Sequence, residues 1–151
     1  AANKLLEEQD IAEDIRKEAL YYRAKAHWAD KQYGLAVVDL TPLSKEVRTT
    51  IGAEAKYLLA ECYFALGSIE LAEEEIMSFT RMQTTQQYWL AKSLILLADI
   101  NIARNDLFQA KQYLLALKGS YRQEDDIQSI ILEKLSYIEE LDSKEKEEET
   151  L

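Results

Sequence analysis

Few residues of this chain have side chains suited to catalysis or metal binding. His27 is the only histidine and Cys62 the only cysteine among 151 residues, and neither lies in a recognisable nucleophile motif. Glu73, Glu74 and Glu75 are consecutive in the sequence. Consecutive helical residues point about 100° apart, so these carboxylates cannot converge on one metal ion. The sequence therefore predicts no catalytic residue, no metal site and no cofactor.

A further acidic run, residues 124–126, has a structural explanation. Carboxylates at the start of a helix accept hydrogen bonds from its first free N–H groups. An apolar stripe begins directly after this run, at Ile127. The sequence also contains no glycine-rich phosphate loop and no zinc-ligand spacing. We therefore expect a protein that is not an enzyme.

The composition predicts long helices in an acidic protein. Four glycines and one proline are too few turn residues for most β or doubly wound folds. The net charge of -10 argues against binding to nucleic acid or to an anionic membrane surface, because both require clustered lysine and arginine. No apolar run reaches the roughly 18 residues of a membrane span, so direct membrane insertion is not expected.

Three segments of the sequence align without gaps, namely residues 21–36, 57–72 and 95–110. Two alanine positions recur in all three. Antiparallel helices approach closely only where side chains are small, so each alanine predicts a helix crossing. The recurring alanines are Ala24, Ala60 and Ala98 at the first position and Ala36, Ala72 and Ala110 at the second.

The turn between the two helices of each segment also recurs. Glycine and asparagine suit the left-handed conformation that follows a helix, and serine and aspartate are good caps for the next helix. The three turn pairs are Lys31-Gln32, Gly67-Ser68 and Asn105-Asp106.

The repeated unit resembles the tetratricopeptide repeat, a helix pair of about 34 residues. The first unit has His27 in place of the family's aromatic residue and Lys31 in place of glycine, and the third has Asn101 and Asn105 there. The resemblance implies an all-α fold: a right-handed superhelix of about three antiparallel helix pairs plus a C-terminal capping helix. The best match is the middle unit, with Ala60, Tyr63, Gly67, Ala72, Ile76 and Phe79 at the family's positions.

We expect one repeat domain over residues 1–141. An exposed terminal repeat must be closed by a helix with a polar outer side, and the apolar stripe that could do this stops at Leu141. The expected divisions are 1–8 as the remnant of a preceding helix in a longer chain, units at about 14–45, 52–82 and 87–118, a capping helix at 125–141, and an acidic mobile tail at 142–151.

In the tetratricopeptide family the first helix of each pair lines a concave groove. The resemblance therefore implies a non-catalytic scaffold that binds a protein or peptide as part of a larger chain. Tyrosine and tryptophan suit such a surface because they bury a large area at small entropic loss. The groove positions in this sequence are Tyr21, Lys25 and Trp28, then Tyr57, Glu61 and Phe64, then Lys92 and Asp99.

An alternative is that Trp28 and Phe64 only pack between adjacent helices. The chain would then be a structural or self-associating terminal segment of a long solenoid, joining copies through its exposed N-terminal face. A looser resemblance links residues 46–48, 52–57 and 87–91 to the last repeats of large envelope-associated proteins of Bacteroidetes-type bacteria. It implies a periplasmic or envelope location if an upstream signal precedes these residues.

Overall fold

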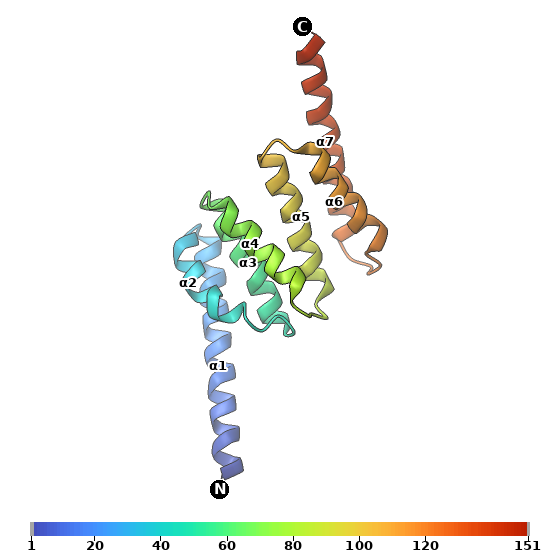
Figure 1. Ribbon diagram of the computed structural model, residues 1–151. Helices are drawn as coiled ribbons and strands as arrows, with labels where there is room; N and C mark the ends of the chain where they lie inside the picture. Colours follow the sequence, from blue (N-terminus) through green and yellow to red (C-terminus); the bar gives the residue numbers. More distant parts are fainter. Residues whose placement is uncertain (1, 151) are drawn as a thin grey trace. The chain divides into compact units, whose positions relative to one another are not determined.

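The computed structural model describes residues 2–150, and no strand occurs within that range. The predicted all-α class is confirmed. Contacts divide the chain into two compact units, Ala1–Gln86 with the first four helices and Gln87–Leu151 with the last three. The helices, shown in Figure 1, are α1 (Ala2–Ala29), α2 (Tyr33–Leu43), α3 (Thr50–Ala65), α4 (Ile69–Arg81), α5 (Gln87–Ala103), α6 (Leu107–Ser120) and α7 (Ile127–Thr150).

The three turns that join α1 to α2, α3 to α4 and α5 to α6 share one backbone geometry. Lys31 and Asn105 have φ of 60°, and Gly67 has φ of 81°. The next N–H in each turn donates to the carbonyl five residues earlier, as Gln32 N does to His27 O at 2.8 Å. A left-handed residue with this bond defines the Schellman motif. The repeated turn predicted from the sequence is therefore confirmed.

The last residue of each turn also begins the next helix. The carbonyl oxygens of Gln32, Ser68 and Asp106 accept hydrogen bonds from the amides of the second-position alanines at 3.0–3.2 Å. The Asp106 side chain caps α6 by accepting from Gln109 N at 3.1 Å. Ser68 makes no side-chain cap, so the prediction of a serine cap was wrong there. All six recurring alanines are buried, as close helix crossings require.

Removing a glycine from the left-handed turn position and introducing one there are expected to change the free energy of unfolding in opposite directions. Gly67→Ala should lower the free energy of unfolding by about 1 kcal/mol, because a Cβ disfavours positive φ. Lys31→Gly should raise it by up to about 1 kcal/mol for the same reason. Urea denaturation measures both. Gly34→Ala is the control, because Gly34 lies within α2 and an added Cβ meets no atom there; an equal loss in that variant would contradict the explanation.

In unit 1, α1 packs on α2, α2 on α3 and α3 on α4, and α1 also meets α3. The N-terminal half of α1 extends beyond the other three helices (Figure 1). Helix α3 is buried without interruption from Gly52 to Ala60. Two of those residues, Glu54 and Lys56, carry charges, so the structure must supply partners for them.

In unit 2, α5, α6 and α7 pack on one another. The apolar stripe of α7 faces this core through Ile127, Ile131 and Ile138, which supports its predicted covering role. The Asp125 carboxylate accepts from Ile127 N at 3.0 Å, as the expected cap does. No helix among residues 2–150 has the length and apolarity needed to cross a membrane.

Both ends of the chain differ from the sequence prediction. Residues 2–8 are not a separate remnant, because they continue without a break into α1. Residues 142–150 are helical, since α7 reaches Thr150, so the expected mobile tail is corrected to a helix end. Glutamate and lysine are good helix formers, and Lys146 pairs with Asp142 one turn away at 3.2 Å. Residues 1 and 151 lie outside the described range.

Candidate protein-binding surface

Three of the predicted groove residues lie on α1, three on α3 and two on α5. Those of α1 and α3 belong to unit 1. The Tyr21 hydroxyl donates to Glu54 Oε1 at 2.7 Å. Lys25 Nζ donates to the Tyr21 hydroxyl at 3.1 Å and lies 3.0 Å from Glu54 Oε2. These three residues, called the α1–α3 cluster below, connect the two helices and supply a partner for the buried Glu54.

The contacts within the α1–α3 cluster determine the protonation states of Tyr21 and Lys25. Burial, followed by the hydrogen bond to Glu54, raises the pKa of the Tyr21 hydroxyl. Hydrogen bonds to Tyr21 and Glu54 raise the pKa of Lys25. The Lys25 ammonium also lies 5.0 Å from the centre of the Tyr21 ring, within range of a cation–π attraction. Near neutral pH, Tyr21 therefore remains a neutral donor and Lys25 a cation.

The predicted aromatic residues differ in their accessibility. The Tyr57 hydroxyl donates to Glu61 Oε1 at 2.7 Å, but Tyr57 is only 8% exposed. Phe64 is partly buried. Trp28 is 36% exposed and is the most accessible of the predicted aromatic anchors in unit 1. Its exposure, rather than residue type, makes Trp28 the strongest candidate to touch a ligand.

On α5, the predicted groove residue Asp99 is held within unit 2. Its Oδ1 lies 2.9 Å from Lys134 Nζ of α7. Asp99 and Lys25 occupy equivalent repeat positions, and Lys25 pairs with Glu54 on the first helix of the next pair. Helix α7 thus contacts α5 as a following first helix would. Lys92, the other predicted residue of α5, is partly buried.

Charged pairs also connect the two helices within a pair. Arg23 donates to both carboxylate oxygens of Asp39 at 2.8 and 2.6 Å, and Lys56 Nζ donates to Glu75 Oε2 at 2.6 Å. Asp39 and Glu75 are 36 residues apart, at equivalent positions. Neither pair was predicted from the sequence, although this spacing of two acids was the available signal.

Histidine 27 has a structural place beside Asp39. Its Nε2 lies 4.0 Å from Asp39 Oδ2 and its Nδ1 lies 3.1 Å from Gln32 Oε1. Both contacts involve α2 or the turn before it, so His27 helps to connect the first helix pair.

The Arg23–Asp39 pair predicts an acid-dependent loss of stability. Hydrogen bonds from Arg23 lower the pKa of Asp39, so the stabilisation is complete above the unfolded-state pKa and is lost as the pH falls through the lower folded-state pKa. Asp39→Asn should lower the thermal midpoint at neutral pH, and its deficit should shrink as the pH falls below about 4. Thermal denaturation across pH tests this. The exposed Asp30→Asn is the control, and a deficit at position 39 that persists unchanged into acid would contradict the assignment.

A pocket of about 720 Å³ lies in unit 1 between α1 and the α2–α3 connection, in the size range of ligand sites. Its apolar lining comes from Leu20, Pro42, Leu43 and Ile51. Its charged lining comes from Glu13, Asp14, Arg16, Lys17, Glu18, Lys45 and Glu46. The pocket thus combines an apolar part with charges of both signs.

Gly52 allows the α2–α3 connection to fold closely against α3. A Cβ at this position would collide with the carbonyl oxygen of Glu46. The Gly52 N–H donates to Thr49 Oγ1 at 3.0 Å, and the same hydroxyl donates to Glu46 O at 2.9 Å. All three residues line the pocket, so this close approach determines one of its walls.

Within the described part of the chain, the possible metal ligands lie apart from one another and the thiol of Cys62 is buried. No three His, Cys, Asp or Glu side chains there could hold a metal ion together. Burial, assisted by the charge of Glu61, raises the pKa of the Cys62 thiol to about 12. Cys62 is therefore an uncharged thiol near neutral pH and a poor nucleophile.

Comparison of the chain with models of protein families, with curated proteins and with solved structures gives no match.

Proposed function

We propose that the chain is a non-catalytic protein-binding scaffold and that it takes a peptide segment of its partner along α1. One continuous face of α1 carries this proposal. Asp14 and Lys17 line the pocket, Tyr21 and Lys25 belong to the α1–α3 cluster, and Trp28 follows at the end of the helix. The spacing of these five residues is three or four, which places them on one side of the helix. We call this surface the binding face.

The dimensions of the binding face suit a short peptide. The fifteen helical residues from Asp14 to Trp28 span about 21 Å. An extended chain of about six residues covers the same length. The pocket at one end can take an apolar side chain, and the partly exposed ring of Trp28 at the other end offers a second apolar contact. Fixed charges between them would orient the backbone and polar side chains.

We also propose that the helix pairs belong to a right-handed tetratricopeptide-like superhelix. Three identical turns, six buried alanines and the equivalent Lys25–Glu54 and Asp99–Lys134 pairs support a repeated unit. In such an array the first helices form the ligand-facing side, which is where the binding face lies.

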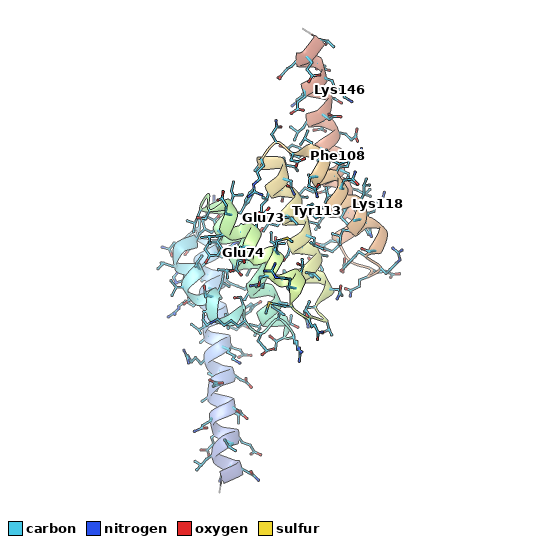
Figure 2. The ribbon with its side chains drawn as sticks, viewed as in Figure 1. Glu73, Glu74, Phe108, Tyr113, Lys118 and Lys146 are labelled. Carbon is cyan, nitrogen blue, oxygen red and sulfur yellow. The ribbon has the colours of Figure 1, made fainter. Side chains whose placement is uncertain are left out.

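Selection from a displayed random-peptide library on the intact chain tests the proposed function. Trp28 fluorescence reports binding in a Trp89→Phe background, where the phenyl ring retains an aromatic neighbour for Tyr88, whose ring centre lies 4.9 Å from that of Trp89. Selected peptides should change Trp28 emission, and Trp28→Ala should weaken their binding at least about tenfold by polarisation of labelled peptide. Phe108→Ala is the control, because Phe108 is 73% exposed on α6 (Figure 2). Failure to select any peptide, or selected peptides that bind Trp28→Ala unchanged, would contradict the proposal.

A further inference from the structure

Helix α1 carries a second surface, on the side away from the binding face. Its apolar and small residues recur every three or four positions and are all exposed; Ile15 is 61% exposed and Tyr22 67%. Neither α2 nor α3 covers them. We call these residues the outer stripe: Ala12, Ile15, Ala19, Tyr22 and Ala26.

The residue sizes in the outer stripe alternate in a heptad pattern. Ala12, Ala19 and Ala26 are seven residues apart, and Ile15 and Tyr22, also seven apart, lie between them. In a parallel pair of identical helices, like positions meet, so alanine would face alanine and tyrosine would face tyrosine. In an antiparallel pair, the alanine positions of one copy instead meet the positions of the large residues in the other copy. The alternation therefore fits an antiparallel copy of the same helix, with a large side chain against a small one in each layer.

The charges of α1 favour the same arrangement. Residues 2–14 hold five acids and one base, whereas residues 15–29 hold four bases and one acid. A parallel pair would place the acidic halves together. An antiparallel pair places each acidic half beside the basic half of the other copy, and it also opposes the two helix dipoles. The alternation of residue sizes and the separation of charges along α1 thus independently favour a second copy of the chain in an antiparallel orientation.

We propose that a second copy of this chain covers the outer stripe, with its α1 antiparallel, so that Ala19 of each copy packs against Ile15 of the other. In this register Ala12 meets Tyr22 of the second copy. The centre of the paired segment is residue 17, and residues 8–26 form a seam about 28 Å long. The proposal goes beyond the peptide-binding function, because it uses the opposite side of α1 and leaves the binding face open.

Sedimentation equilibrium of the full chain tests the association. We expect a reversible dimer, and Ile15→Lys should raise its dissociation constant at least about tenfold, because the seam would then have to bury an ammonium in each copy. Val38→Lys is the matched control, since Val38 is an equally exposed apolar residue on α2, and it should leave the dissociation constant unchanged. Circular dichroism checks that both variants keep the wild-type helicity. A wild-type chain that stays monomeric at high concentration, or a dimer that Ile15→Lys does not weaken, would overturn the proposal.

Disulfide trapping tests the orientation. Ile15→Cys mixed with the wild-type chain has no partner thiol at the seam, whereas Ile15→Cys mixed with Ala19→Cys should form a cross-linked heterodimer under mild oxidation. The native Cys62 is buried, so the unmodified chain should form no cross-link. Efficient cross-linking of Ile15→Cys alone would show a parallel pair, and absence of the mixed cross-link would reject the register; either result overturns the proposal.

Discussion

Replacing Phe79 with alanine is expected to lower the free energy of unfolding by about 3–5 kcal/mol. Phe79 is fully buried and has the largest fully buried side chain of the described residues. It lies near the end of α4, among the core residues of unit 1. Removing the ring loses its transfer free energy and leaves a cavity that the packed helices can fill only in part. Urea denaturation followed by circular dichroism measures the loss.

The matched control for that variant is Phe108→Ala. Phe108 lies on α6 and is exposed (Figure 2), so the same chemical change should alter stability by no more than about 0.5 kcal/mol. Similar losses in the two variants would contradict the placement of Phe79 in the core.

Replacing Glu75 with leucine is expected to destabilise the chain by about 3 kcal/mol. The Lys56 ammonium lies 2.6 Å from the Glu75 carboxylate, and Lys56 is buried on α3. Without the carboxylate, this ammonium would remain buried and unpaired, or α3 would have to shift to expose it. Thermal and urea denaturation both report the change.

Two further variants test the cause of that loss. In Lys56→Met with Glu75→Leu, both charges are gone, so most of the lost stability should return. Glu74→Leu removes the neighbouring exposed carboxylate (Figure 2), which lies 3.7 Å from Arg81, and should change stability by less than about 1 kcal/mol. A double variant as unstable as Glu75→Leu would show that the missing carboxylate, not the unpaired ammonium, causes the loss.

The repeated parts of the fold were predictable from the sequence. Small residues at helix crossings and the left-handed turn residue are local requirements, so Ala24, Ala36 and Gly67 indicate them directly. The helix ends were less predictable. Residues 142–150 have no apolar stripe, and their helix depends on intrinsic propensity and on pairs such as Asp142–Lys146, which the sequence analysis interpreted as a solvated tail.

The candidate surface was predictable only in part. The resemblance selected the helix faces of Tyr21, Lys25 and Trp28, and the structure brings Tyr21 and Lys25 together through Glu54. The resemblance could not show that Trp28 is exposed whereas Tyr57 is buried, because the exposure of a side chain depends on the bulk of the neighbouring helices. The pocket was not predicted at all, since one wall depends on the close approach of the α2–α3 connection to Gly52.

The two proposals assign separable roles to helix α1. Its binding face is expected to take a peptide, and its outer stripe is expected to join two copies. Ile15→Lys changes only the outer stripe and should leave peptide affinity unchanged, whereas Trp28→Ala changes only the binding face and should leave the dimer intact. The two proposals can thus fail independently.

Hydrogen exchange of the chain with a selected peptide bound tests the central claim most directly. We predict slower amide exchange in residues 14–28 of α1 and in the first turns of α3, with no change in α5, α6 or α7. A selected peptide that binds but slows amide exchange only in the last three helices would contradict the assignment of the binding face to α1.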